Sequence, residues 1–184
     1  MEFSIRRATL EDRAALERLI AESARGLSRG DYSDEQVEAA IASVFGVDTD
    51  LIHDGTYYVA EFEGEPVGCG GWSKRRTLFG GDRFAARDSG RLDPSTEPAK
   101  IRAFFVRPDW ARRGVAGHVL ETCEREAKAQ GFRALELMAT LPGVRLYAAR
   151  GYEAGEPVEY EIADGVTIEF VPMRKELEEV ISDE

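Results

Sequence analysis

Cysteine, histidine and long apolar runs are scarce in this chain of 184 residues, and each scarcity excludes a class of protein. Cys69 and Cys123 lie far apart in apolar surroundings, so the sequence predicts neither a disulfide framework nor a cysteine-based metal site. His53 and His118 have no partner at a spacing that metal ligation uses, so we expect no bound metal. No apolar run approaches the roughly 18 residues of a membrane span, so we expect no membrane partner.

Basic residues are also few relative to acidic ones. The chain has 24 lysines and arginines and 35 acidic residues, which gives a net charge of −11. Such an acidic surface argues against nucleic acid as a partner, since phosphate contacts need basic side chains. The basic residues that are present gather at 74–76 and near the middle of the chain, at Arg102, Arg107, Arg112 and Arg113. This clustering indicates a local site for an anion. The acidic remainder either attracts a cationic substrate or keeps the protein in solution.

The overall composition is that of one globular domain. Hydrophobic residues make up 43% of the chain and charged residues 32%. A chain of this length can bury a core without disulfides or metals. We expect a single domain over residues 1–176 and a charged tail over 177–184. Glu2 and the absence of a signal-peptide-like apolar stretch predict a cytoplasmic location.

Hydrophobic periodicity and turn residues predict an α/β domain with about seven strands. We expect strands over 3–8, 56–62, 66–73, 101–106, 134–140, 153–162 and 166–174. Helices are expected over 10–25, 34–45, 113–130 and 143–150, with Thr9 and Ser33 as N-caps of the first two. Residues 74–99 have no clear period, so they predict a long loop near a substrate site or a surface insertion.

The most informative stretch covers residues 106–120. An apolar strand is followed by a Pro-Asp turn, a basic loop with glycines, and an amphipathic helix. The first turn of a helix presents unpaired N–H groups and partial positive charge, which together favour an anion. Small residues leave room for a phosphate and arginines add charge: Gly114, Ala116, Gly117, Arg112 and Arg113. The segment therefore predicts a pyrophosphate site, although small residues at a helix start also serve ordinary packing.

Two common nucleotide motifs do not explain this segment. The NTPase phosphate loop needs Gly-x-x-x-x-Gly-Lys-Ser/Thr, and that string does not occur. The dinucleotide fingerprint needs Gly-x-Gly-x-x-Gly early in a βαβ unit, whereas here Gly114 and Gly117 follow a strand beyond mid-chain.

The loop instead resembles the acetyl-coenzyme A loop of the GNAT N-acetyltransferase superfamily, which reads Gln/Arg-x-x-Gly-x-Gly/Ala. Residues 114–116 match its second half, while Ala111 departs at the first position, where the neighbouring arginines supply charge. Residues 146–152 are similar to the late tyrosine signature of the family. Residues 5–12 and 170–175 look like its first and last strands. The resemblance thus spans roughly residues 3–176 in the right order.

The resemblance implies a fold and a cofactor site. The fold would be α/β, with a mixed, mostly antiparallel central sheet of about seven strands, flanked by helices and splayed between strands 4 and 5. Acetyl-CoA would be the co-substrate, and no metal is implied. Its pantetheine arm would pair with the strand backbone, and its pyrophosphate would meet the loop; the residues concerned are Phe104, Phe105, Val106, Arg112, Arg113, Gly114, Val115, Ala116 and Gly117. A backbone N–H near Val106 would stabilise the developing charge on the thioester carbonyl.

The implied chemistry is direct attack of a primary amine on the thioester. Tyr147 matches the family tyrosine that gives a proton to the leaving thiolate, and its alternative is a packing role. Glu136 roughly matches a glutamate that some members use as general base, and Glu97 and Glu61 are further candidates. Each of these carboxylates could equally be a solvated surface group.

The sequence leaves the acceptor open between a small amine, an antibiotic and a protein amino group. A different class of function also fits, namely a degenerate member that binds acyl-CoA as a sensor or interaction module. Alternating apolar residues in the last two strands, from Val158 to Phe170, leave strand edges available and favour a homodimer.

Overall fold

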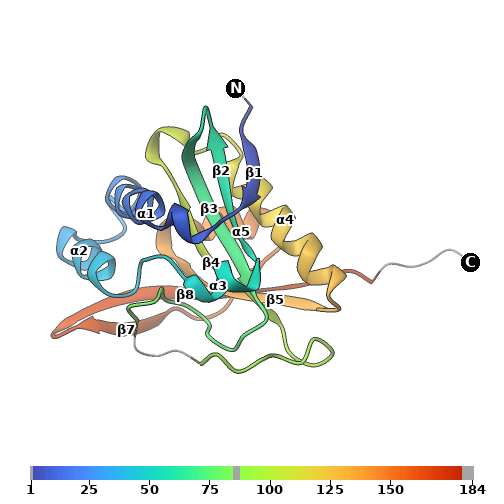
Figure 1. The fold of residues 1–184 in the computed structure, drawn as a ribbon. Coiled ribbons are helices and arrows are strands. Elements are labelled where there is room, and N and C mark those ends of the chain that lie inside the picture. The colour runs from blue at the N-terminus through green and yellow to red at the C-terminus, as the bar shows by residue number, and fades with distance from the viewer. Residues whose placement is uncertain (1, 85–87, 180–184) are drawn as a thin grey trace, which may run out of the picture.

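The computed structural model describes residues 2–84 and 88–179 (Figure 1). Within these residues the α-helices are α1 (Arg13–Leu27), α2 (Asp34–Ala42), α3 (Thr49–Asp54), α4 (Val115–Ala129) and α5 (Val144–Ala149). The strands are β1 (Ser4–Arg7), β2 (Tyr57–Phe62), β3 (Glu65–Ser73), β4 (Ala99–Val106), β5 (Ala134–Thr140), β6 (Glu153–Ala154), β7 (Val158–Ala163) and β8 (Val166–Glu176). Single 3-10 turns precede three helices: η1 (Leu10–Asp12), η2 (Pro108–Trp110) and η3 (Leu141–Gly143). No helix in these ranges is long and apolar enough to cross a membrane.

The strands form one mixed sheet in the order β1-β2-β3-β4-β5-β8-β6, with β7 also paired to β8. Each pair is antiparallel except β4 and β5, which run parallel. The predicted fold class is therefore confirmed. The described residues form eight strands rather than seven, because the strand expected over 153–162 is divided into β6 and β7. Pro157 lies in the break, and its lack of an N–H prevents it from donating to the ladder.

The splay between β4 and β5 has a visible cause in the backbone. The two strands pair only at Ala99 with Leu135 and at Lys100 with Glu136. Just beyond, β4 carries one more residue than β3 between successive pairs, and Ala103 in this bulge has φ +57°. A bulge bends its strand and increases the local twist. The second half of β4 therefore turns away from β5 and opens a gap in the sheet.

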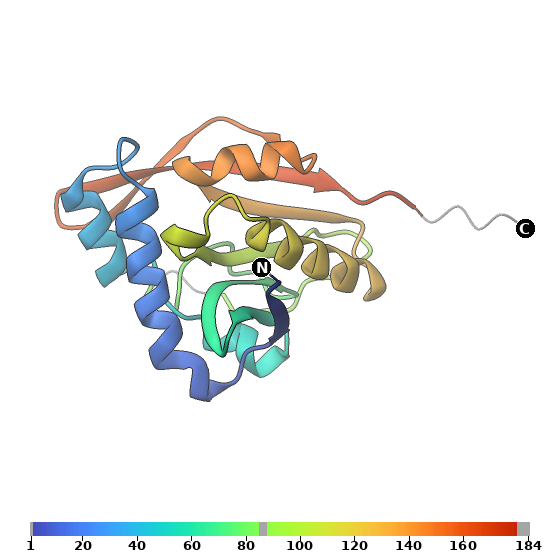
Figure 2. The ribbon, with the colours of Figure 1, turned by 90° about the horizontal axis from the view of Figure 1, so that it is seen from above.

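Helices cover both faces of this sheet (Figures 1 and 2). Helix α4 packs on β3 and β4, and its face of the sheet buries a core that includes Trp72, Leu120 and Leu135. Helices α1, α2 and α3 lie on the other face, over a core that includes Leu16 and Leu51. The gap between β4 and β5 connects these two layers, which places the candidate site at the centre of the molecule.

The predicted helix starts agree with the caps. Ser33 Oγ accepts from the Gln36 N–H in a capping box, and Thr9 and Asp12 form a second box ahead of α1. Helix α2 ends earlier than expected, where Ser43 Oγ donates to the Ala39 carbonyl. Helix α3 was not predicted, because its six residues are too few to show a helical period.

The described part of the 74–99 loop is tied to the body by backbone hydrogen bonds. Gly81 N–H donates to the Val44 carbonyl, and Asp82 N–H donates to the Val47 carbonyl. Phe79 packs against Tyr160 and Phe170 of the last two strands. Residues 85–87 of this loop, and residues 180–184 of the expected C-terminal tail, lie outside the described residues.

Candidate active site

A cleft of about 690 Å³ opens where β4 and β5 diverge, and we call it the outer cleft. Its walls come from the C-terminal half of α1, the end of β4, the loop over residues 111–117 (the glycine loop) and the η3–α5 segment. Eight of the nine predicted cofactor residues line it: Phe104, Phe105, Val106, Arg112, Gly114, Val115, Ala116 and Gly117. The ninth, Arg113, instead places its guanidinium 5.0 Å from the ring centre of Trp110, a cation–π contact.

The glycine loop ends in a conformation suited to an anion. Gly114 is the N-cap of the 15-residue helix α4 and has φ +83°, a backbone angle that glycine adopts without strain. Arg112 also has a positive φ, of +61°. The N–H groups that follow Gly114 begin the helix and have no intrahelical acceptor. Because these groups border the outer cleft, the helix dipole and the free donors act on whatever occupies it.

Gly117 is a glycine for a reason that the sequence did not indicate. A Cβ at this position would collide with the guanidinium of Arg150, which follows α5 and lies against the first turn of α4. Arg150 also forms an ion pair with Glu121 on α4. The missing side chain therefore brings a second positive group close to the helix N-terminus, in addition to leaving space.

The β4 end of the cleft carries a hydrogen bond that sequence reasoning missed. Val106 N–H donates to Ser23 Oγ of α1 at 3.2 Å. The Ser23 side chain is buried on the face of α1 that also carries Leu16, Leu19 and Ile20. A serine at the apolar spacing of an amphipathic helix was the available signal, because a buried hydroxyl needs a partner.

Tyr147 lies on α5 and lines the outer cleft, buried from solvent. Its ring has edge contacts with Phe104 and Tyr152, with ring centres 6.3 and 5.7 Å away. Burial raises the pKa of the Tyr147 phenol well above its ordinary value of 10. The phenol is therefore held in its neutral, proton-donating form.

A smaller inner cavity of about 80 Å³ adjoins the outer cleft. Five residues line both of them: Phe45, Phe104, Phe105, Thr140 and Tyr147. The glycine-rich part of the long loop, at Gly80 and Gly81, forms one wall. Arg102 lies at another wall, almost fully buried, with its guanidinium ion-paired to the buried Asp48 and donating to the Gly80 carbonyl.

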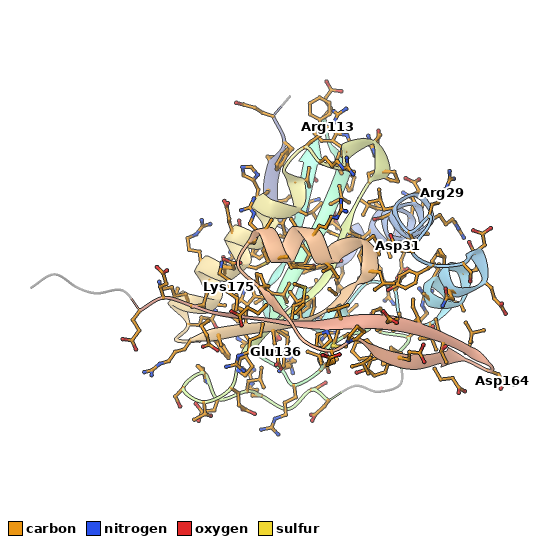
Figure 3. The ribbon with its side chains drawn as sticks, turned by 180° about the vertical axis from the view of Figure 1, so that it is seen from behind. Arg29, Asp31, Arg113, Glu136, Asp164 and Lys175 are labelled. Atoms are coloured by element: carbon orange, nitrogen blue, oxygen red, sulfur yellow. The ribbon has the colours of Figure 1, made fainter. Side chains whose placement is uncertain are left out.

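Glu136, the residue predicted as general base, lies outside the outer cleft and the inner cavity. Glu136 forms an ion pair with Lys100 at the paired end of β4 and β5, and it lines neither cavity. Figure 3 shows Glu136 and Arg113 of the glycine loop on opposite sides of α5. Glu97 receives the Asp93 N–H, and Glu61 is paired with Arg6. Among the described residues, no carboxylate or imidazole lines the inner cavity.

Tyr32 was also missed by the sequence analysis and fixes the far rim of the cleft. Its hydroxyl accepts from the Leu141 N–H at 3.0 Å and donates to the Glu169 carbonyl. Burial raises the pKa of Tyr32 to about 12, so it keeps this donor. The hydroxyl thereby joins the α1–α2 connection to η3 and β8, the segments that position α5.

The comparisons with known proteins agree with this geometry. The family model described as the Acetyltransferase (GNAT) family matches residues 15–152. No curated protein matches the chain. A GCN5-related N-acetyltransferase from Rhodopseudomonas palustris superposes with a TM-score of 0.72 at 22% identity, covering 96% of this chain and 97% of that one.

Two further solved structures share the fold and were determined with coenzyme A. The PaiA N-acetyltransferase of Thermoplasma acidophilum has a TM-score of 0.65 at 16% identity, with 96% of this chain and 100% of that one covered. The N-acetylglutamate synthase of Neisseria gonorrhoeae, solved with coenzyme A and N-acetyl-glutamate, has a TM-score of 0.57 at 17% identity, with 97% and 36% covered. Since the family model spans most of the sequence and the fold agrees, the chain belongs to the GNAT acetyltransferase family.

Proposed function

We propose that this protein is an acetyl-CoA-dependent N-acetyltransferase that moves the acetyl group to a primary amine by direct attack. One observation carries the proposal. The outer cleft has the N-terminus of α4 along one wall and the buried phenol of Tyr147 along another. Two structures with the same fold are complexes with coenzyme A, which supports the same ligand here.

The residues of the cleft fit coenzyme A chemically. The pyrophosphate would bind at residues 112–117, where free N–H groups and the dipole of α4 favour negative charge. Within the described ranges, Arg112 and Arg145 line the cleft without an ion-pair partner, so both are available to phosphate groups. The pantetheine arm would lie along residues 104–106 of β4, where the splay from β5 provides the gap.

In the proposed reaction the nitrogen lone pair of a neutral amine attacks the thioester carbon. The C–N bond forms, the carbonyl oxygen becomes an oxyanion, and the N–H of Val106 stabilises it. The C–S bond then breaks, and the thiolate takes the phenolic proton of Tyr147. The nitrogen loses its proton to solvent, and solvent returns a proton to the phenolate of Tyr147, which restores the enzyme. Glu136 would assist only through a chain of water, because its carboxylate is held by Lys100.

The test combines binding with turnover. Acetyl-CoA should raise the melting temperature, because a ligand at 100 times its Kd stabilises the folded state by about 2.7 kcal/mol. A panel of amines should then release free coenzyme A thiol. Binding without thiol release from any amine would instead favour the second candidate, an acyl-CoA sensor or interaction module.

We also propose that the protein forms a homodimer through the edge of β7. Val158 on this strand is 38% exposed, and β7 pairs on one side only within the described residues. Light scattering at tens of micromolar should give twice the chain mass of 20.4 kDa. A mass of a single chain would remove the dimer and leave the enzymatic proposal unchanged.

A further inference from the structure

The size of the inner cavity limits the part of the acceptor that enters it. Its volume is about 80 Å³. Since a single water molecule needs a site of only roughly 10–15 Å³, the cavity has room for several non-hydrogen atoms. A six-membered ring or a short branched chain fits this space, whereas an aminoglycoside does not. Because the cavity adjoins the outer cleft at Tyr147, a group bound there would hold its amine beside the thioester.

The side chains on the walls of the cavity are mostly apolar and six of them are aromatic, while polar atoms share the exposed surface with them. They include Phe45 from the α2–α3 connection, Phe79 from the long loop, Met138 from β5 and Phe170 from β8. The rings of Phe79 and Phe170 contact each other with centres 5.4 Å apart. Aromatic side chains favour a flat apolar group through dispersion and edge-to-face contacts. The long loop thus completes the pocket instead of extending away from it.

The charges around the cavity exclude a second ammonium group. Within the part of the chain that the structure describes, the ionisable side chains that line it are Arg102 and Tyr147. Asp48 pairs with Arg102 from outside the cavity, and Asp31 lines the outer cleft only. A polyamine would therefore bury a positive charge without a counter-ion, which is strongly unfavourable.

The residues that line the inner cavity also determine whether the attacking amine can lose a proton there. An ammonium has no lone pair, and among the described lining residues no carboxylate or imidazole stands ready to deprotonate it. The buried guanidinium of Arg102 also disfavours a positive charge nearby. An aromatic amine avoids both difficulties, because its lone pair is delocalised into the ring and it is already uncharged at neutral pH.

From these observations, and resting on the proposed acetyltransferase function, we infer that the acceptor is a small monoamine with a flat apolar group, and that aromatic amines are its best class. The ring would occupy the inner cavity and the amino group would face the outer cleft beside Tyr147. No base is required, since the amine arrives neutral. Its proton leaves to solvent after the C–N bond has formed.

The experiment measures thiol release from saturating acetyl-CoA with aniline, benzylamine, cyclohexylamine, putrescine and a lysine-containing peptide. Aniline should have a kcat/KM at least tenfold above putrescine and the peptide. Its rate should stay flat from pH 6.5 to 9, because neither substrate nor enzyme needs to lose a proton before the attack. Benzylamine should gain rate steadily with pH. Preferred turnover of putrescine or the peptide overturns the inference while leaving acetyltransfer intact.

A matched pair of variants locates the acceptor. Phe79→Ala removes a wall of the cavity and should raise the KM for aniline about fivefold or more, with acetyl-CoA binding unchanged. Phe84→Ala is the control, because Phe84 packs on Phe79 with ring centres 5.1 Å apart but does not line the cavity. Equal KM values for the two variants would count against the binding of the acceptor ring in the inner cavity.

A binding readout keeps the inference testable if no amine is acetylated, an outcome that would count against the proposed function instead. Acetanilide, the product of aniline acetylation, should raise the melting temperature of the protein loaded with coenzyme A. The shift should be smaller in Phe79→Ala than in Phe84→Ala. No shift from acetanilide in the parent protein overturns the inference.

Discussion

The backbone N–H of Val106 donates a hydrogen bond to the Oγ of Ser23, 3.2 Å away on α1. This N–H belongs to the half of β4 that lies beyond the bulge, so β5 does not accept from it. In the proposed reaction the same N–H turns to the thioester carbonyl. A hydroxyl can both accept and donate, so Ser23 can hold the N–H before the cofactor arrives and donate to the oxyanion afterwards. In that reaction helix α1 would contribute the Ser23 hydroxyl to the end of the cleft where the thioester lies.

Replacing Ser23 by alanine should destabilise the protein. The change removes a part-buried hydrogen bond of the Val106 N–H, and such a bond contributes about 0.5–1.5 kcal/mol to the free energy of unfolding. Urea unfolding should show a lower midpoint at unchanged slope. Ser28→Ala is the matched control, since Ser28 is equally buried, lines the same cleft and forms no side-chain hydrogen bond within residues 2–84 and 88–179. Equal midpoints for the two variants would show that the Ser23 bond contributes nothing.

Replacing Gly114 by glutamate should abolish the thermal shift given by acetyl-CoA while leaving the protein folded. The new carboxylate would lie at the helix N-terminus and compete with the pyrophosphate for the same donors. Gly165→Glu provides the control, because Gly165 also has a positive φ, of +72°, but lies in the β7–β8 turn. Both variants carry similar backbone strain, so only the loss of binding should distinguish them. A normal shift in Gly114→Glu would falsify the assignment of the glycine loop.

Arg150 should add affinity for acetyl-CoA from its place against Gly117. Because this arginine is about one-third exposed, solvent limits its effect, and Arg150→Ala should raise the Kd about two- to fivefold. The effect should shrink at high salt, as for any exposed charge. Glu121→Gln frees the same guanidinium from its partner and should move the Kd the other way. Calorimetry that shows the same Kd in both variants would contradict this role.

The sequence predicted the strands and the glycine loop because both have local signatures, in alternation and in the strand–loop–helix pattern. It did not predict the bulge at Ala103, since a positive φ at a non-glycine residue leaves no compositional trace. Nor did the sequence predict that Glu136 lies outside the cleft that Tyr147 lines. This placement follows from the parallel register that sets Lys100 opposite Glu136, and register between strands far apart in sequence is a tertiary property. Ser23 could be predicted in part. Its position on the apolar face of α1 follows from the sequence, but its hydrogen bond to the Val106 N–H does not.

Replacing Tyr147 by phenylalanine should lower kcat by roughly ten- to a thousandfold, below or within the usual range for one acid–base group. The ring and its contacts remain, so the Kd for acetyl-CoA should change little. Tyr152→Phe is the control, because its ring touches Tyr147 but its hydroxyl donates to Glu124 instead of lining the cleft. Single-turnover measurement must show that chemistry limits the rate. An unchanged rate would then remove Tyr147 from the mechanism and leave the fold and cofactor site standing.

The pH dependence of the reaction provides a separate check on Tyr147. Burial raises the pKa of its phenol, so the folded enzyme keeps this proton as the pH passes 10, where an exposed tyrosine ionises. The single-turnover rate should therefore show no alkaline loss from this group between pH 7 and 10. The same pKa shift affects the stability of the protein. Above about pH 10 the folded state keeps the Tyr147 proton that the unfolded state loses, so the free energy of unfolding falls as the pH rises further. An alkaline limb centred below pH 10 that disappears in Tyr147→Phe would mean that the phenol is not shielded as the structure shows.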